Sequence, residues 1–143
     1  MNKFKFSSPT TIYFGTGELE RIKKVAPQVG KNALIVIGQG SVKKHGYLAK
    51  LEKFLDSANV KHEVFEGIEP NPRSTTINAA GDKAAEMKAD MIIALGGGSV
   101  MDAAKGIAIV AKNGDDIWDY CPTRERPGRA PCSALPDRFA AGL

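Results

Sequence analysis

Residues 91–105 read MIIALGGGSVMDAAK, and this stretch decides the fold class. The run at 91–95 is continuously apolar, as in strands that are buried on both faces of a parallel sheet. Three glycines and a serine follow at 96–99, and apolar residues then recur at helical spacing from 100 to about 112. The stretch therefore predicts a buried strand, a tight glycine turn and a helix.

The same alternation of apolar runs and helical patterns extends back towards the N-terminus. Residues 33–37 (ALIVI) predict a second buried strand, and shorter runs at 62–65 and 11–14 predict two more. Strands that alternate with helices at this spacing indicate a parallel sheet with right-handed crossovers. We therefore predict an α/β fold, a Rossmann-like parallel sheet with flanking helices. The expected helices cover 19–27, 48–55, 74–88 and 100–112. The first should stop at Pro27, and Ser74 or Thr75 should cap the third.

The composition changes near residue 120, where we expect a single domain at 1–120 to end. All lysines precede this point, whereas 121–143 hold both cysteines, four of the eight prolines and four of the six arginines. Prolines at this spacing break helices and remove strand donors, so we predict an irregular tail. The tail is also rich in residues with GC-rich codons. Two explanations stay open, a proline-rich surface tail and a change of reading frame.

Composition also excludes several functions. The formal net charge of +4 is small and evenly spread, and only 7% of the residues are aromatic, which argues against a nucleic-acid surface. No apolar run approaches the roughly 20 residues that span a bilayer, and the N-terminus has no apolar signal region. Two cysteines make no disulfide framework, so we expect a reducing cytoplasm.

The glycine turn at 96–99 is the strongest candidate for a ligand site. Ligands of an open parallel sheet bind beyond the carboxyl ends of its strands, where this turn is expected. Without Cβ atoms, backbone N–H groups can approach a diphosphate closely, and the start of the following helix adds partial positive charge. A plain tight turn is the alternative, and neither GxGxxG nor the P-loop pattern is matched. The candidate diphosphate ligands are Gly96, Gly97, Gly98 and Ser99.

Asp102 and Lys105 interrupt a helix that is otherwise apolar and is expected to be buried nearly all round. An unpaired buried charge is costly, so each charge should be paired or lie beside a ligand. Asp102 falls in the first turn, close to the expected ligand crevice. It therefore contacts the ligand, or is stabilised by the helix dipole or by an ion pair with Lys105.

The loop expected after strand 33–37 indicates which dinucleotide binds. An acidic residue near this point usually holds the ribose hydroxyls of NAD, and the loop contains none. Lys43 and Lys44 could instead accept a 2′-phosphate, since a charge-assisted hydrogen bond is worth about 1.5–3 kcal/mol. Two solvated lysines are the alternative. We predict NADP as the cofactor and NAD as the second choice, with Gly38, Gln39, Gly40 and Ser41 as the binding loop.

A third loop holds Asn71 between two prolines. The prolines restrict the backbone, and the side-chain amide could reach a ribose or a phosphate of the ligand. A plain turn explains the same residues almost as well.

Four segments together resemble the iron-containing alcohol dehydrogenases, particularly the branch of butanol dehydrogenases and NADPH-dependent aldehyde reductases. The last of them carries the specific GGGSxxDxxK pattern of that family. The segments are PTTIYFGTG at 9–17, GQGSVKKHG at 38–46, GIEPNPR at 67–73 and ALGGGSVMDAAK at 94–105.

The resemblance implies a role for each loop. Residues 96–99 would hold the cofactor diphosphate, and Asp102 would lie near the nicotinamide. Residues 38–41 would surround the adenosine ribose and its 2′-phosphate, and Asn71 would line the same cleft. Members of the family transfer a hydride between NAD(P)H and a primary alcohol or aldehyde. A divalent iron or zinc ion polarises the substrate oxygen in that reaction.

The resemblance is expected to stop at residue 120, before the helical domain whose aspartate and three histidines bind the metal. We therefore expect a truncated NAD(P)-binding domain, weakly active or inactive alone, and assign no catalytic or metal-binding residue. An exposed sheet edge would favour a homo-oligomer. Two other readings remain: a non-catalytic, self-assembling fragment with a vestigial nucleotide site, and a polyol dehydrogenase or sugar-phosphate lyase on the same fold. The loops at 39–44 and 70–72 favour the alcohol dehydrogenase branch over the last of these.

Overall fold

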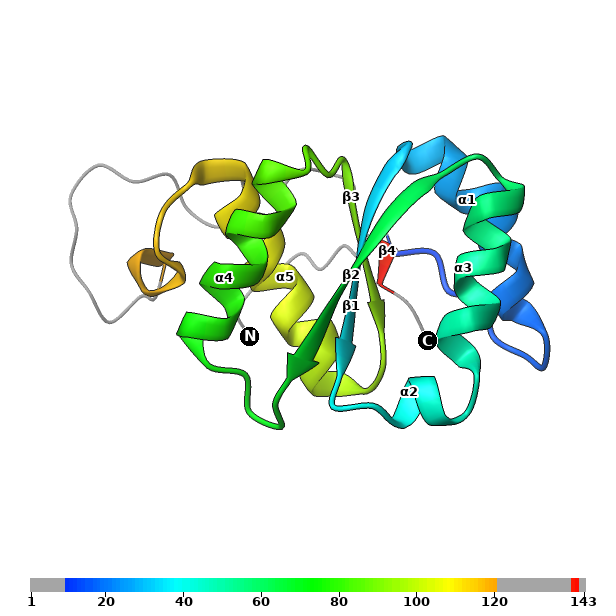
Figure 1. Ribbon diagram of the computed structural model, residues 1–143, viewed down its shortest axis with the longest axis horizontal. Helices are drawn as coiled ribbons and strands as arrows, with labels where there is room; N and C mark the ends of the chain where they lie inside the picture. The colour runs from blue at the N-terminus through cyan, green and yellow to red at the C-terminus, as the bar shows by residue number, and fades with distance from the viewer. Residues whose placement is uncertain (1–9, 121–139, 142–143) are drawn as a thin grey trace, which may run out of the picture.

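The fold is built on one parallel sheet. The computed structural model describes residues 10–120 and 140–141 of the chain. The strand order is β2-β1-β3-β4, and every pair runs parallel (Figure 1). The predicted α/β class and parallel sheet are confirmed. The strands are β1 (Asn32–Gly38), β2 (Lys61–Ile68), β3 (Met91–Leu95) and the two-residue β4 (Ala140–Ala141).

Helices cover both faces of the sheet. Figure 1 shows α1 and α3 on one side and α4 and α5 on the other. The short helix α2 follows β1 at the carboxyl end of the sheet. The helices are α1 (Ile22–Val29), α2 (Ser41–Lys44), α3 (Tyr47–Ser57), α4 (Ser74–Glu86) and α5 (Gly98–Asn113), with short 3₁₀ turns at Glu18–Arg21 and Ile117–Tyr120.

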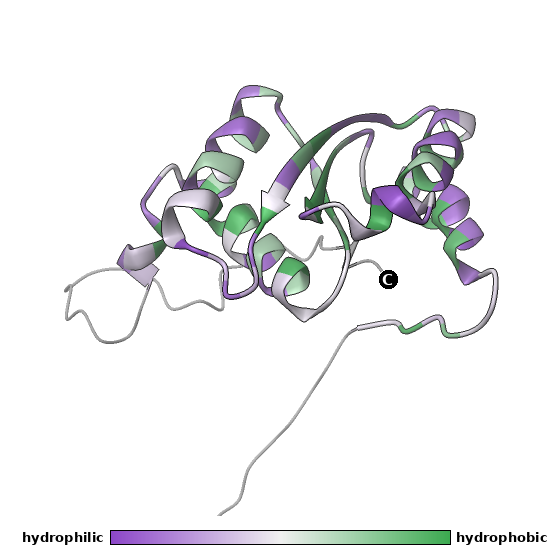
Figure 2. Cartoon of the chain, turned by 60° about the horizontal axis from the view of Figure 1, so that its bottom comes forward, coloured by the Kyte–Doolittle hydropathy of each residue, from purple (hydrophilic) through white to green (hydrophobic). Residues whose placement is uncertain are grey.

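The apolar runs form the core because the central strands are covered on both faces. Leu34 and Val36 pack towards α4 and α5, whereas Ile35 and Ile37 pack towards α1 and α3. All four are fully buried. Figure 2 shows the strands at the centre as apolar, with hydrophilic residues on the outward sides of the helices. Burying each such side chain stabilises the fold by about 1.5–3 kcal/mol.

A β-bulge interrupts the pairing of β1 with β2. Ile37 pairs with Glu66 but Gly38 pairs with Ile68, so Gly67 is an extra residue in β2. Its φ of 104° lies in the left-handed region that favours glycine. As a result Phe65 and Ile68, although three residues apart, both pack into the cluster on the α4–α5 face.

Several sequence predictions of local structure were wrong. Residues 11–14 form no strand with any other part of the chain that the structure describes, and Ile12 and Phe14 are 81% and 98% exposed. Helix α1 continues two residues past Pro27. Its last turn closes through the Gly30 N–H, 3.0 Å from the Ala26 carbonyl oxygen, and does not need the missing proline donor.

The predicted cap of α4 was also wrong. The helix is preceded by Arg73, and no side chain of the described region caps it. The Ser74 hydroxyl instead accepts a hydrogen bond from Trp118 Nε1 at 2.7 Å. Helix α4 ends at Glu86, two residues before the predicted end, because Lys88 takes a left-handed φ of 54°.

The tail is described at only two residues. The strand β4 pairs with β3, so the expectation of no regular structure beyond 120 does not hold at Ala140–Ala141. The remainder of 121–143 lies outside the described residues. In the part of the chain that is described, no helix is both long and apolar enough to cross a membrane.

Candidate functional site

The order of the strands places a crevice between β1 and β3. The chain passes from β1 outwards to β2 and then returns to place β3 on the other side of β1. In open parallel sheets, ligands bind outside the carboxyl ends of the strands at such a reversal. The loops that follow β1 and β3, which the sequence indicated as candidate ligand loops, therefore flank this crevice.

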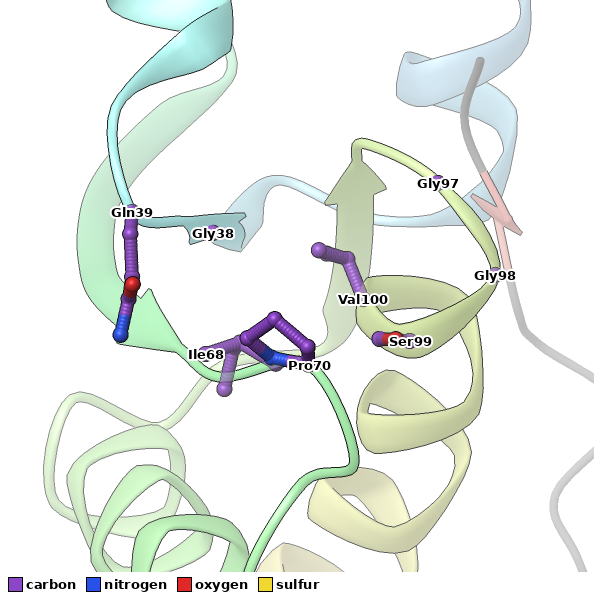
Figure 3. Close-up of a pocket in the computed structure, with 8 residues that line it drawn as sticks. All are labelled: Gly38, Gln39, Ile68, Pro70, Gly97, Gly98, Ser99 and Val100. Carbon is purple, nitrogen blue, oxygen red and sulfur yellow. The ribbon is translucent and has the colours of Figure 1, made fainter.

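A cavity of about 230 Å³ opens at this position. Figure 3 shows Gln39 and Pro70, from the loops after β1 and β2, across from the turn that carries Gly97 and Gly98. Five predicted site residues line the cavity, and three lining residues were missed. The predicted ones are Gly38, Gln39, Gly97, Gly98 and Ser99, and the missed ones are Ile68, Pro70 and Val100.

The missed residues are apolar walls rather than polar ligands. Ile68 and Val100 also belong to the core, so they join the cavity floor to the packed interior. Pro70 stands one residue before Asn71, in the loop that the sequence did identify. The pair of prolines could have indicated Pro70 as a lining residue, whereas the prediction named only the polar residue between them.

The three glycines of the turn differ in why a glycine occupies each position. A Cβ on Gly96 would lie 2.8 Å from Val100 Cγ2, so packing against the next helix requires glycine there. A Cβ on Gly97 or Gly98 would meet nothing within 4 Å. Neither residue has a positive φ. Packing thus explains Gly96, whereas neither packing nor backbone strain explains Gly97 and Gly98, which line the cavity.

Helix α5 begins at this turn. Gly97 is its N-cap residue, and the N–H groups of Val100 and Met101 both lie 3.1 Å from the Gly97 carbonyl oxygen. The first N–H groups of a helix have no acceptor within the helix and carry partial positive charge. An anion in the cavity would therefore face donors from Gly98 and Ser99.

The loop after β1 brings together residues that the sequence kept apart. Gly40 has a φ of 111° and precedes α2, whose Lys43 forms an ion pair with Glu66 of β2. The sequence prediction counted no acid near this loop. The structure corrects it, because Glu66 pairs in register with Ile37 and so reaches the same edge of the sheet. Gly40 and Ser41 do not line the cavity.

Asn71 lies in the loop after β2 with a φ of 58° and does not line the cavity. Glu69 anchors this loop to the start of α4, since Thr76 Oγ1 donates to Glu69 Oε1 at 3.0 Å. Hydrogen bonds from its own backbone N–H and from the Thr76 hydroxyl hold the pKa of Glu69 below the usual glutamate range. Glu69 is therefore ionised at neutral pH and positions the loop.

Asp102 does not line the cavity. Its Oδ1 is 2.9 Å from Lys105 Nζ, and the two side chains are 73% and 65% exposed. The expectation that α5 is buried nearly all round was wrong, because these charges occupy a solvent-facing stripe on the helix. The ion-pair alternative for Asp102 is confirmed.

The described residues differ in how well they fit the two groups that the resemblance implies. A dinucleotide fits in part. The open positions at Gly97 and Gly98 leave room for a diphosphate, and the cavity is smaller than the 300–1,000 Å³ typical of whole-ligand pockets. A divalent metal does not fit, since residues 10–120 bring together no cluster of three or more His, Cys, Asp or Glu side chains.

This sheet, with glycine loops at the reversal of its strand order, defines an α/β protein of the doubly wound class. The family model described as "Iron-containing alcohol dehydrogenase" matches residues 9–142. The chain belongs to the iron-containing alcohol dehydrogenase family, and it corresponds to the N-terminal part of the family's proteins. The match continues beyond residue 120, so the expectation that the resemblance stops there was wrong.

Two curated relatives are named for different cofactors. The "Probable NADH-dependent butanol dehydrogenase 1" of Bacillus subtilis is 38% identical over 127 residues, which is 89% of this chain and 33% of that protein. The "NADPH-dependent aldehyde reductase YqhD" of Escherichia coli is 37% identical over 138 residues, 95% of this chain and 34% of that protein. The chain thus spans about a third of the length of these relatives.

Two solved structures share the fold. An archaeal alcohol dehydrogenase from a Red Sea brine pool, ADH/D1 bound to NZQ, superposes with a TM-score of 0.85 at 36% identity, over 97% of this chain and 36% of that one. Sulfoacetaldehyde reductase from Bifidobacterium kashiwanohense, in complex with NAD⁺, superposes with a TM-score of 0.73 at 27% identity, over 87% of this chain and 33% of that one.

Proposed function

We propose that residues 1–120 form an NAD(P)-binding domain that holds a nicotinamide dinucleotide in the crevice between β1 and β3. The single observation that carries the proposal is the pair Gly97 and Gly98. Each lacks a side chain where a Cβ would meet only open space, at the N-terminus of α5. This arrangement suits the close approach of a diphosphate. We also propose that this domain is located in the cytoplasm.

The residues of this chain would bind and orient the cofactor. Gly97 and Gly98 admit the diphosphate, Ser99 offers a hydroxyl and the first turn of α5 offers N–H donors. Gln39 and Pro70 close the cavity from the facing loops. A bound NAD(P)H supplies hydride to an aldehyde, and NAD(P)⁺ accepts it from an alcohol. No step of the proposal passes through a metal, because the described residues form no site for one.

We propose NADP as the preferred cofactor and NAD as the second choice. Lys43 and Lys44 follow the loop after β1, and both are exposed. One of the two relatives named above is called NADPH-dependent and the other NADH-dependent, so membership of the family is compatible with either dinucleotide. The nearby lysines support the choice of NADP.

Calorimetric titration with NADPH and NADH tests the proposal. The decisive variant is Gly97→Asp, because aspartate is a favourable N-cap residue and its Cβ would enter open space. We expect the fold to keep its thermal stability while the carboxylate repels the diphosphate and weakens binding at least about tenfold. Gly97→Asn is the matched neutral control and should weaken binding less. Equal affinity in Gly97→Asp and the wild type would contradict the site.

A second candidate function is a non-catalytic module that self-assembles and keeps only a vestigial nucleotide site. The exposure of Ile12 and Phe14 favours it, since contiguous apolar residues on a surface mark association sites. Absence of any dinucleotide binding, together with concentration-dependent self-association, would favour this candidate over the first.

A further inference from the structure

The ion pair between Lys43 and Glu66 bears on the choice of dinucleotide. Lys43 is the third residue of α2, two residues after Ser41. Glu66 is the residue of β2 that pairs with Ile37, next to Gly38. Both charges therefore stand beside the loop after β1, which is expected to surround the adenosine ribose.

Both partners are accessible to a ligand. The Lys43 and Glu66 side chains are 46% and 47% exposed, and their charged ends are in direct contact. Half-exposed pairs are weak, with a typical worth of at most about 1 kcal/mol. A ligand phosphate can therefore compete with Glu66 for the Lys43 ammonium group. The free energy needed to separate Lys43 from Glu66 then reduces the affinity for that phosphate.

The two dinucleotides differ at one position that responds to these charges. NADPH carries a dianionic 2′-phosphate on the adenosine ribose, whereas NADH carries a 2′-hydroxyl. A carboxylate accepts hydrogen bonds from ribose hydroxyls but repels a phosphate. An ammonium attracts the phosphate. While Glu66 holds Lys43, the positive charge available to NADPH is reduced.

We propose that Glu66 is a specificity-determining residue, which restrains the preference for NADPH by neutralising Lys43. The inference rests on the proposed dinucleotide site and adds a residue from β2 to its specificity. Lys44 makes no ion pair with any side chain in residues 10–120, so it supplies the attraction that Glu66 does not offset.

The test compares the dissociation constants of NADPH and NADH for the wild type and Glu66→Gln, measured by titration at one ionic strength. Glu66→Gln keeps the shape of the side chain and removes its charge. NADPH should bind about fivefold more tightly to this variant, and NADH should change less than about twofold. Lys43→Gln should act in the opposite direction and weaken NADPH more than NADH.

The matched control is Glu63→Gln. Glu63 lies on the same strand and forms an ion pair with Lys83 of α4, at 3.1 Å and on the opposite face of the sheet. The Glu63→Gln substitution removes the same charge from the protein as Glu66→Gln, so it reports the effect of net charge alone. The NADPH-to-NADH ratio should not move in this variant.

The outcomes distinguish the specificity role of Glu66 from the dinucleotide site itself. An unchanged ratio in Glu66→Gln, or an equal change in Glu63→Gln, would overturn the specificity role while leaving the dinucleotide site in place. No binding of either dinucleotide to any variant would overturn the site itself and this inference with it.

Discussion

The Asp90 carboxylate accepts a hydrogen bond from the backbone N–H of Asn32, with Oδ1 2.8 Å from that nitrogen. It also accepts one from the Lys31 N–H, which lies 2.8 Å from Oδ2. In return the Asp90 N–H donates to the Asn32 carbonyl oxygen at 2.9 Å. Asp90 directly precedes β3 and Asn32 begins β1, so this contact joins the amino ends of the two strands whose carboxyl ends flank the cavity.

Replacing Asp90 by alanine should therefore destabilise the fold. Two backbone N–H groups would lose a charged acceptor at an exposed position, at a cost of about 1–2 kcal/mol. Urea denaturation would show a lower midpoint with an unchanged slope. Retention of the full free energy of unfolding would contradict a role for this carboxylate in joining the strands.

Gly30 provides an independent check on the same contact. A Cβ on Gly30 would lie 2.2 Å from Asp90 Oδ1, so alanine there must displace the carboxylate. We expect Gly30→Ala to cost about 1–3 kcal/mol. The double variant with Asp90→Ala should cost less than the sum of the two changes, because no carboxylate remains to be displaced. Additive costs, measured by the same denaturation, would show that the two residues act separately.

Glu69 should make the free energy of unfolding depend on pH in the acidic range. Its folded pKa is lowered by hydrogen bonds to its own N–H and the Thr76 hydroxyl, so its contribution is present above the pKa of the unfolded chain and is lost as pH falls through the folded pKa. Glu69→Gln should be less stable than the wild type at neutral pH, and the gap should narrow below about pH 5. Thr76→Val removes one donor and should show a smaller effect in the same direction. A gap that is independent of pH would contradict the assignment.

Trp118 reports on the contact between the turn at Ile117–Tyr120 and α4. The chain contains one tryptophan, and its Nε1 donates to Ser74 Oγ at 2.7 Å. The Ile117 N–H also donates to Asn78 Oδ1, at 3.0 Å. Ser74→Ala should shift the tryptophan emission to longer wavelength and increase its quenching by acrylamide. The expected cost in stability is about 0.5–1.5 kcal/mol. An unchanged spectrum would contradict a role for the Ser74 hydrogen bond in holding the tryptophan.

Self-association is expected to depend on Phe14. This side chain is 98% exposed and lies two residues from Ile12, which is 81% exposed. Sedimentation velocity should show a homo-oligomer at micromolar concentration that Phe14→Ser shifts towards the monomer. Tyr47→Ser serves as the control, since Tyr47 is also exposed, at 53%, but lies on α3. A wild type that sediments as a monomer at all concentrations would contradict the prediction.

The elements that the sequence predicted best are those buried on both faces. The run at 91–95 coincides with β3, and 33–37 lies inside β1, because a continuous apolar run has few other ways to be covered. The run at 11–14 looked similar in composition, but a strand also needs a neighbour to pair with. Pairing is a property of the whole fold and leaves no local mark in the sequence.

The candidate site was predictable only where backbone geometry forms it. The turn at Gly97 and Gly98 is local, so its glycines revealed it. Glu66 was missed because it approaches the loop after β1 through strand pairing, 23 residues along the chain from Lys43. The exposure of Asp102 and Lys105 was not predicted, because the many apolar residues of the helix masked the exposed stripe that these two charges mark.

The bulge at Gly67 fits one residue more into β2 than its pairing with β1 requires. Side chains alternate along a strand, so one extra residue inverts the parity of everything that follows it. The bulge at Gly67 absorbs such an extra residue, so Ile68 still pairs with Gly38 and faces α4 and α5 together with Phe65. A strand that stayed regular through Gly67 would turn Ile68 towards α1 and α3, whereas deletion of Gly67 would leave Ile68 paired with Gly38. Loss of Gly67 should therefore be tolerated better than a one-residue insertion or deletion elsewhere in β2.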